Sequence, residues 1–286
     1  MSGTSGAAST AESVPRRVDR IDAAFARCRA AGRAAIIPYL TGGYPTAAAF
    51  ESTLLEMDRA GADVIEIGIP FSDPIADGPV IAEAMHTVLV TGVTPKTIFE
   101  VVRRLRPRLA VALVAMVSVS IVARMGVDPF VDAAAESGFD GLIVPDLDLD
   151  DAEPLVRRCA ARGLALILLV APTSSPQRVA RITALCSGFV YVLAQVGVTG
   201  ERSTLPAGLP RRIAELRTVT TLPLAVGFGI ASPTQVAEVA AHADGVIVGS
   251  AIVRRMADPD RAVDEAVALL RALQPALVRG SAEPAR

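Results

Sequence analysis

The sequence predicts an α/β protein that folds as one (β/α)8 TIM barrel with an extra N-terminal helix. Eight short apolar or β-branched segments alternate with Ala-rich amphipathic segments. Several of the amphipathic segments begin with a capping residue followed by proline. A chain of 286 residues also suits a barrel, which needs about 250 residues and folds as a single unit. An open, doubly wound parallel sheet is the alternative architecture.

The expected strands are runs of three to eight mostly apolar residues, many of them Val, Ile or Leu. Such continuous apolar runs are typical of parallel strands that are buried on both faces. Parallel strands need crossover connections, and eight strand-helix units close into a barrel surrounded by helices. The predicted strands are 35–39, 64–67, 110–117, 141–144, 165–170, 189–193, 224–226 and 245–248.

Helix boundaries are indicated by capping residues and glycines. Segment 46–60 is expected to end at Gly61, and segment 155–162 at Gly163, because glycine often follows the last helical turn. A Ser, Thr or Asp before a proline marks a helix start. This pair occurs as Thr94-Pro95, Asp128-Pro129, Ser175-Pro176, Ser232-Pro233 and Asp258-Pro259.

No linker or shift in charge divides the middle of the chain, so we expect one domain over residues 18–274. Residues 1–17 and 275–286 are expected to be flexible tails. The leading helix, 18–31, either plugs the barrel end away from the active site or lies on the surface without a special role.

Composition excludes several classes of protein. The longest apolar runs, 109–117 and 164–171, are shorter than the roughly 18 residues of a membrane span. The first residues have neither a basic start nor an apolar stretch, so we expect a cytoplasmic protein without a signal peptide. The 28 basic and 30 acidic residues nearly balance, and the basic segment 103–108 is interpreted as the solvated end of a helix. Nucleic acid is therefore not an expected partner.

The scarcity of some side chains narrows the chemistry further. Lys96 is the single lysine and stands at an expected helix start, which argues against a Schiff base. His86 and His242 provide too few imidazoles for a histidine metal site or a Ser-His-Asp triad. The three cysteines are widely spaced and form no recognisable disulfide or zinc pattern. Catalysis would therefore depend on carboxylates, tyrosines and backbone amides, with no metal.

Two acidic positions are the best candidates for catalytic groups. Glu66 stands inside an expected buried strand, where an ionised carboxylate without a partner is costly, so its pKa should be raised. We interpret Glu66 as a general acid or base, with a hydrogen-bonded core glutamate as the alternative. The following loop, 70–79, holds Asp73 and Asp77 among three prolines and a glycine. Spacing alone does not choose between these two aspartates.

Glycines and tyrosines mark the ends of other strands. Glycine-bearing segments 197–200, 227–230 and 249–251 follow the last three expected strands. Because glycine lets backbone N–H groups approach an anion, and barrels bind phosphate after strands seven and eight, these segments predict a phosphate site. Tight turns are the alternative explanation. Tyr39 and Tyr191 are expected at the ends of their strands. They either lie at the catalytic face of the barrel or serve only in packing.

Taken together, these segments resemble the tryptophan synthase alpha chain family. The resemblance covers residues 21 to about 273, and the second of the following motifs is highly specific to the family. The motifs are PYLTGGYP (38–45), IEIGIPFSDPIADGP (65–79), GVTG (197–200), GFGI (227–230) and GSAIV (249–253).

The resemblance implies a lyase of tryptophan biosynthesis that splits indole-3-glycerol phosphate into indole and glyceraldehyde 3-phosphate without a cofactor. It also implies a partner, the beta chain, which would carry pyridoxal phosphate in an α2β2 tetramer. On the family pattern Glu66 and Asp77 are the catalytic carboxylates and Tyr191 is an active-site tyrosine. The implied phosphate-binding residues are Gly200, Gly229, Gly249 and Ser250. The implied substrate pocket consists of Tyr39, Ile81, Ile143, Thr199 and Phe228, of which all but Thr199 fall on the family's indole pocket.

The chain departs from the family pattern at three places on the expected rim. Segment 117–121 reads VSVSI where the family usually has Tyr-x-Asn, Asp148 replaces the proline of Asp-Leu-Pro, and Ala194-Gln195 replaces Ser-Arg. These changes favour, as an alternative, a stand-alone lyase that releases free indole. A sugar-phosphate isomerase or epimerase and a non-catalytic activator subunit are further alternatives.

Overall fold

The computed structural model describes residues 20–73, 77–195, 205–227 and 229–279, and in this part of the chain it contains one sheet of parallel strands. The order of strands in the sheet is β5-β4-β3-β2-β1-β9-β8-β7-β6. Their bounds are β1 (Ala35–Thr41), β2 (Val64–Gly68), β3 (Ala112–Met116), β4 (Gly141–Ile143), β5 (Ala165–Ile167), β6 (Leu169–Val170), β7 (Val190–Leu193), β8 (Leu224–Gly227) and β9 (Gly245–Val248).

The sheet closes into a barrel because its two end strands belong to one stretch of chain. β5 pairs with β4, and β6 pairs with β7. Leu168 alone separates β5 from β6, so the predicted strand 165–170 changes partners at this residue. Nine assigned strands therefore occupy eight barrel positions, and the predicted TIM barrel is confirmed. The predicted strand 110–117 is shorter in the structure, and β1 continues two residues past Tyr39.

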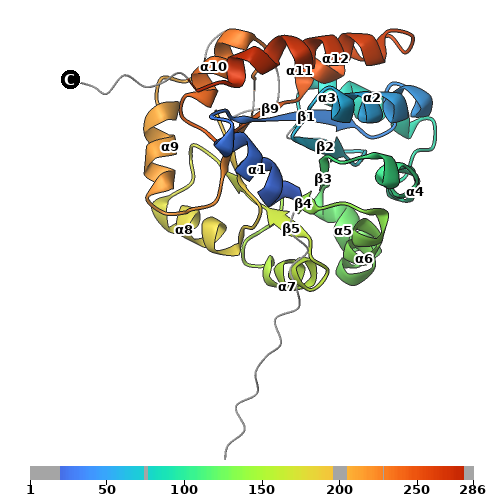
Figure 1. Cartoon of the computed structure of the whole chain (residues 1–286). Helices are drawn as coiled ribbons and strands as arrows, with labels where there is room; N and C mark the ends of the chain where they lie inside the picture. The colour runs from blue at the N-terminus through green and yellow to red at the C-terminus, as the bar shows by residue number, and fades with distance from the viewer. Residues whose placement is uncertain (1–19, 74–76, 196–204, 228, 280–286) are drawn as a thin grey trace, which may run out of the picture.

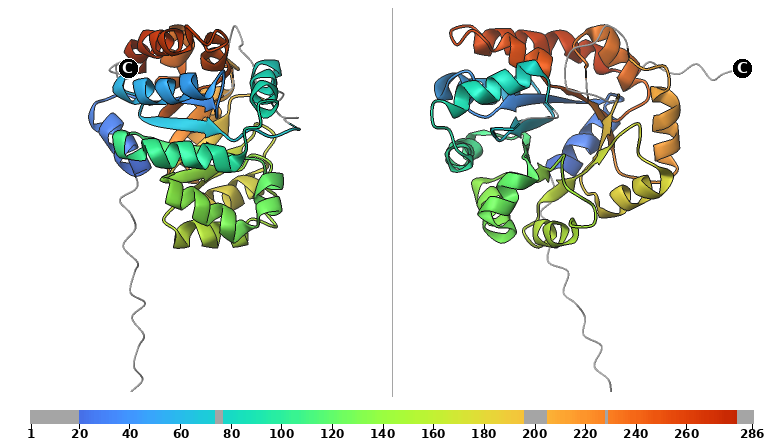
Figure 2. Two further views of the ribbon diagram at one scale, coloured as in Figure 1. Left: turned by 90° about the vertical axis from the view of Figure 1, so that its right-hand side faces the viewer. Right: turned by 180° about the vertical axis from the view of Figure 1, so that it is seen from behind.

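Helices surround the sheet, as Figures 1 and 2 show from three directions. Each crossover between neighbouring parallel strands carries at least one of them. The helices are α1 (Arg20–Ala30), α2 (Ala47–Arg59), α3 (Pro79–Leu89), α4 (Pro95–Leu105), α5 (Val119–Met125), α6 (Val127–Ser137), α7 (Glu153–Ala161), α8 (Pro176–Leu185), α9 (Leu209–Arg217), α10 (Pro233–Ala240), α11 (Ser250–Arg255) and α12 (Ala262–Leu273), with 3-10 turns η1 (Arg106–Arg108) and η2 (Gln274–Leu277).

Capping explains several of these helix starts. Thr94, Ser175 and Ser232 accept hydrogen bonds from backbone N–H groups in the first turns of α4, α8 and α10, as predicted. The predicted starts at Asp128 and Asp258 were wrong. α6 begins at Val127, two residues before the expected first helical residue Pro129, and follows Gly126 with φ 86°. α12 begins only at Ala262, because the segment around Asp258 forms a turn.

Side chains alternate between the two faces of each strand, as the period of two requires. On β1, Ile36 and Leu40 belong to the large apolar cluster between the barrel and its helices, whereas Ile37 belongs to the cluster inside the barrel. On β2, Ile65 faces the helices and Val64 faces the interior. Glu66 lies two residues after Val64 and therefore faces the interior as well.

α1 covers the N-terminal end of the barrel. Its apolar side chains Ile21, Ala24 and Phe25 are buried within the interior cluster, and the rings of Phe25 and Phe189 lie 5.5 Å apart. Figure 1 shows α1 in front of the strands. The helix therefore plugs the end opposite the carboxyl ends of the strands, which was one of the two predicted roles.

Two other expectations, about a charged segment and about the C-terminal residues, hold only in part. Arg103, Arg104 and Arg108 are exposed at the end of α4 and just after it, as expected. Arg106 is the exception in this segment, because its guanidinium group donates to the carbonyl oxygens of Leu109 and Val111 and its side chain is largely buried. The residues directly after 274 are not a free tail. Leu277 is buried, Val278 pairs with Arg33, and the Arg279 side chain donates to Asp244.

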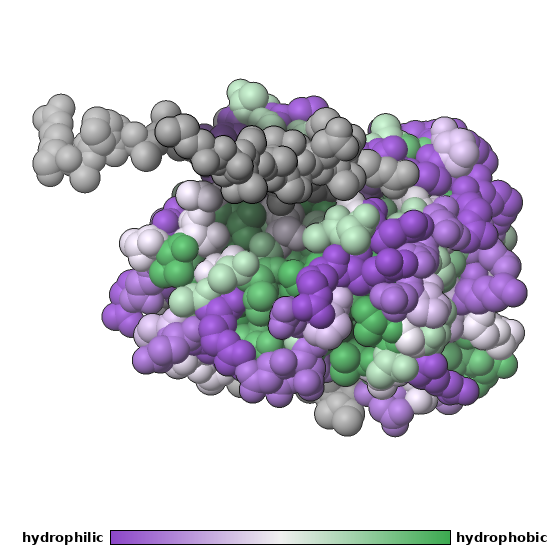
Figure 3. Space-filling view, turned by 90° about the horizontal axis from the view of Figure 1, so that it is seen from below, coloured by the Kyte–Doolittle hydropathy of each residue, from purple (hydrophilic) through white to green (hydrophobic). Residues whose placement is uncertain are grey.

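The outer surface carries many ion pairs. Arg158 contacts Asp128 and Asp132, and Arg162 contacts Asp132, which ties α6 to α7. Figure 3 views the molecule from the side on which Figure 1 shows these two helices, and hydrophilic side chains (purple) are prominent there around hydrophobic ones. Within the described ranges, no helix combines the length and the apolar character needed to cross a membrane.

Candidate active site

Glu66 and Tyr39 face each other at the carboxyl end of the barrel. The register of the parallel pair β1 and β2 sets Tyr39 beside Glu66 and Thr41 beside Gly68. Tyr39 and Thr41 share the interior face of β1 with Ile37 because they follow it at intervals of two residues. The strand pairing thus brings an aromatic hydroxyl and a carboxyl group to one corner of the barrel mouth.

The carboxyl group of Glu66 is almost completely buried, with a residue exposure of 1%. Its Oε2 atom has no hydrogen-bond partner among the described residues. Burial raises the pKa of Glu66 to about 8, and the nearby charge of Asp77 contributes to the shift. Glu66 is therefore mostly protonated at neutral pH and can act as a proton donor.

Asp77 is the second carboxyl group of the site. It lies just before Gly78, the N-cap of α3, and it is only partly exposed. Burial raises the pKa of Asp77 to about 6, so this group is mostly ionised at neutral pH. Asp73, the other candidate of the same loop, is exposed and accepts a hydrogen bond from Ser72 at 2.6 Å. The structure thus separates two aspartates that spacing alone did not distinguish.

Two tyrosine hydroxyl groups flank the carboxyl pair, and each lies over a glycine of a neighbouring strand. A Cβ atom added at Gly68 would lie 2.0 Å from the Tyr39 hydroxyl oxygen, and one added at Gly227 would lie 2.4 Å from that of Tyr191. Both tyrosines are buried, which raises the pKa of each well above its ordinary value. The charges of Glu66 and Asp77 act in the same direction on both.

The predicted substrate pocket is partly assembled in the described residues. Ile81 packs with Tyr39 in a small apolar cluster next to α3, and Ile143 lies in the interior cluster at the end of β4. Met116, at the end of β3, packs against both clusters and joins them. Thr199 and Phe228, the remaining predicted members, lie outside the described residues.

The predicted phosphate-binding residues follow two adjacent strands, β8 and β9. Gly229 adopts φ 87°, a conformation that favours glycine, two residues after β8. Gly249 is the N-cap of α11, and because it has no side chain it cannot accept a hydrogen bond from the N–H groups of the first turn. Ser250 is the first helical residue and is buried. Gly200 lies outside the described residues.

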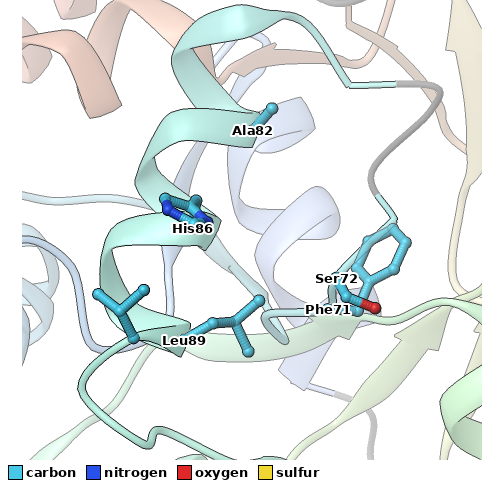
Figure 4. A pocket seen from close by; sticks show the side chains of 6 residues that line it. Phe71, Ser72, Ala82, His86 and Leu89 are labelled. Atoms are coloured by element: carbon cyan, nitrogen blue, oxygen red, sulfur yellow. The ribbon is translucent and has the colours of Figure 1, made fainter.

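A hollow of about 290 Å³ lies beside this site rather than in it. Figure 4 shows Phe71 and Ser72 of the loop after β2 on one side of the hollow and Ala82, His86 and Leu89 of α3 on the other. The carboxyl groups of Glu66 and Asp77 do not line it. Among the described residues, no group of three or more His, Cys, Asp or Glu side chains could hold a metal ion.

Sequence reasoning did not identify Met116 or Gly68 as parts of the site. It placed Gly227 in a predicted phosphate-binding segment, 227–230, but not against the hydroxyl of Tyr191. The signal for Met116 was available, because it ends a strand and alternates with residues that face the helices. The two glycines could not be found in the same way. Their role depends on tyrosines of neighbouring strands, and that contact appears only when the register is known.

Comparisons with known proteins agree with this geometry. The family model described as tryptophan synthase alpha chain matches residues 25–279. The tryptophan synthase alpha chain of Chloroflexus aurantiacus is 44% identical over 265 residues, which cover 92% of this chain and all of the relative. The tryptophan synthase alpha chain of Halorhodospira halophila is 45% identical, over 90% of this chain and 97% of the relative. The chain is also similar in structure to Mycobacterium tuberculosis tryptophan synthase, with a TM-score of 0.85, 36% identity and coverage of 92% and 99%.

Proposed function

The chain belongs to the tryptophan synthase alpha chain family, and from this membership we propose that it cleaves indole-3-glycerol phosphate to indole and glyceraldehyde 3-phosphate. The reaction is a retro-aldol cleavage that needs no cofactor on this chain. One observation carries the proposal. Glu66 and Asp77 lie near each other at the carboxyl end of the barrel with pKa values of about 8 and about 6, so that one is an acid and the other an anion at neutral pH.

The bond to be broken joins carbon C3 of the indole ring to the glycerol chain. Transfer of a proton from Glu66 to C3 would convert the ring to a cationic indolenine, which can accept the electron pair of that bond. As the bond breaks, the neighbouring glycerol hydroxyl becomes an aldehyde and loses its proton to a base. The Glu66 carboxylate left by the first transfer can take this proton, so the enzyme returns to its starting state.

Asp77 would face the ring N–H and stabilise the positive charge that develops on the indolenine. This role requires an ionised carboxylate in a site where water does not screen the charge. A protonated Glu66 and an ionised Asp77 meet both requirements of the reaction. Tyr191 would position the glycerol hydroxyl, because its own hydroxyl group lies close to the charge of Glu66.

The remaining predicted residues would bind the two ends of the substrate. We assign the indole ring to Tyr39, Ile81, Ile143 and Phe228, and the phosphate to Gly200, Gly229, Gly249 and Ser250. Thr199 is assigned to the same substrate pocket. The contact of Tyr39 with Ile81 supports the first assignment. The adjacency of β8 and β9, whose ends carry Gly229 and Gly249, supports the second.

We also propose a beta chain as partner, in an α2β2 tetramer in which the beta chain holds pyridoxal phosphate. We propose the cytoplasm as the location of this enzyme. Family membership supports this partner. The altered rim residues favour a specific alternative, in which the chain acts alone and releases free indole. The two possibilities differ in the effect of an added beta chain on the rate.

The test is the rate of indole release from indole-3-glycerol phosphate by the purified chain, alone and with a tryptophan synthase beta chain. We expect Glu66→Gln to lower this rate by several orders of magnitude, because glutamine cannot donate the proton. Glu83→Gln is the matched control, since Glu83 is exposed on α3, and it should retain the wild-type rate.

Each outcome selects one function. A slow rate that rises strongly with the beta chain indicates an alpha subunit, and a fast rate that ignores the beta chain indicates a stand-alone lyase. Indole release that survives Glu66→Gln contradicts the proposed mechanism. The absence of indole under every condition contradicts the proposed reaction and favours an isomerase, an epimerase or an activator subunit.

A further inference from the structure

The layer of side chains at the mouth of the barrel has a gap at Gly68. The residues of β2 that face the interior follow one another at intervals of two, and Gly68 comes after Val64 and Glu66 in this series. The strand register pairs Gly68 with Thr41 of β1 and Met116 of β3, which both carry side chains. Between these two neighbours, β2 therefore offers no side chain at the level just beyond Glu66.

The phenol ring of Tyr39 fills this gap. A Cβ atom added at Gly68 would lie 2.0 Å from the hydroxyl oxygen of Tyr39, 2.6 Å from its Cζ and 2.8 Å from its Cε2. In the register Tyr39 stands beside Glu66, two residues before Gly68, so its buried side chain leans from β1 across the end of β2. A side chain at position 68 and the present position of the ring exclude each other.

The contact with Tyr39 is what requires glycine at position 68. Gly68 is the last residue of β2 and is not among the glycines with positive φ, so its backbone conformation suits other residues as well. The three atoms nearest to an added Cβ all belong to Tyr39. At Gly42, by contrast, an added Cβ would also approach a backbone oxygen, that of Gly68, to 3.1 Å. A substitution at position 68 would therefore act first on the ring of Tyr39.

Buried side chains fill the space on the other side of this ring. Tyr39 forms one apolar cluster with Ile81, Ala84 and Met85 of α3 and with Val253 of α11, and each of these four residues is at most 3% exposed. Close-packed side chains of this kind do not yield easily to an added group. A ring that is displaced from β2 has room only toward the barrel axis. The proposed reaction assigns that space to the indole ring.

We propose that Gly68 is a positioning residue that sets the room available to the indole ring of the substrate. Because position 68 has no side chain, the phenol of Tyr39 lies against β2 and stays out of the space beyond Glu66. A larger residue at position 68 would turn this phenol into the place of the indole ring. The inference rests on the proposed function, because it concerns the binding of the same substrate, and it adds a residue that acts through Tyr39.

Binding of the two reaction products separates this role from a general effect on the fold. The chain contains no tryptophan, so the fluorescence of indole itself reports its binding, and calorimetry measures the binding of glyceraldehyde 3-phosphate. Gly68→Ala should weaken indole binding about ten- to hundredfold, the range that follows from overpacking a filled site. The affinity for glyceraldehyde 3-phosphate should stay at the wild-type value, because the proposed phosphate site follows β8 and β9 rather than β2.

Two further variants show whether the effect passes through Tyr39. Gly208→Ala is the matched control, since an added Cβ there meets no atom within 4 Å and the residue has φ −80°, and it should bind both products like wild type. Tyr39→Leu removes the three atoms that an added Cβ at Gly68 would meet, and on its own it should weaken indole binding modestly. In the Tyr39→Leu background, Gly68→Ala should cause no further loss of indole affinity.

The outcomes decide the inference. A wild-type indole affinity in Gly68→Ala overturns it, as does an equal loss of affinity for both products. If Gly68→Ala does not fold, the double variant decides, because a folded double variant with the indole affinity of Tyr39→Leu supports the inference. A double variant that does not fold, or that binds indole more weakly than Tyr39→Leu, overturns it.

The proposed function is judged separately. It stands as long as the wild-type chain releases indole and Glu66→Gln does not, whatever the affinities of the Gly68 variants. A wild-type chain that neither binds nor releases indole contradicts the proposed function and the inference together.

Discussion

The carboxylate of Asp146 accepts a hydrogen bond of 2.7 Å from the hydroxyl of Ser118. It accepts another of 2.8 Å from the backbone N–H of Val119, the first residue of α5. Ser118 follows β3 and Asp146 follows β4, so this contact joins two adjacent loops at the carboxyl end of the barrel. Both loops depart from the family pattern, at segment 117–121 and at Asp148. The contact joins Ser118 of the altered segment to Asp146, which the chain shares with the family.

We predict that Asp146→Ala lowers the free energy of unfolding by about 1 kcal/mol, which is typical for the loss of a helix cap. The loops after β3 and β4 should also become less ordered. If this rim binds the beta chain, stimulation by the beta chain should fall by a larger factor than the rate of the chain alone. Urea unfolding and indole release with and without the beta chain measure the two effects. Asp151→Ala, an exposed change in the same loop, should leave both unchanged.

The pH dependence of the reaction follows from the two carboxyl groups. The active form has an ionised Asp77 and a protonated Glu66, so kcat should rise as the pH passes about 6 and fall as it passes about 8. The profile of kcat between pH 5 and pH 9 measures both limbs. A rate that keeps rising above pH 8 would show that Glu66 acts only as a base.

Glu66 should also destabilise the fold at alkaline pH. Its pKa is raised from 4.5 to about 8 by folding, so between these values the native chain binds more protons than the unfolded chain. Stability therefore falls as the pH rises through this window. Glu66→Gln removes the effect, and we expect the variant to unfold at a higher urea concentration than wild type at pH 8, with a smaller difference at pH 5. A midpoint difference that does not depend on pH would contradict the raised pKa.

The sequence predicted the parts of this molecule that depend on local pattern. Apolar runs located the eight barrel positions, and capping residues located α4, α8 and α10. The position of Glu66 within an apolar strand correctly indicated burial and a raised pKa. Each of these features is encoded within a few neighbouring residues, because strand period and helix capping are short-range properties.

Features that depend on distant residues were not predicted. The break at Leu168 reflects closure of the barrel, since β5 and β6 pair with opposite ends of the sheet. The burial of Arg106 depends on carbonyl groups at the start of β3 and on Asp140. Spacing alone left Asp73 and Asp77 open, and Asp77 was predicted only from the family resemblance. Which of the two side chains is shielded from solvent is a property of the folded loop.

A repeated contact at the opposite end of the barrel also escaped the sequence analysis. Asp63, Asp140 and Asp244 directly precede β2, β4 and β9. Each accepts the backbone N–H of a residue at the start of a neighbouring strand, at 2.8 to 2.9 Å, and each pairs with at least one arginine. The backbone donors are Ile36, Leu113 and Leu224, and the arginines include Arg33, Arg20 and Arg279.

We predict that Asp63→Ala strongly destabilises the protein without changing its chemistry. Both oxygens of Asp63 bind Arg33, at 2.7 and 2.8 Å, and one also accepts the N–H of Ile36. Removing the carboxylate leaves a half-buried guanidinium group and a buried N–H unpaired, which should cost about 2–4 kcal/mol.

Asp63→Asn should cost less, because it retains an acceptor for Ile36. Asp22→Ala, an exposed change on α1, should cost almost nothing. Urea unfolding measures the differences, and kcat of the folded variants should stay at the wild-type value because this end lies away from Glu66. A loss in Asp63→Ala no greater than that in Asp22→Ala would show that the contact does not stabilise the barrel.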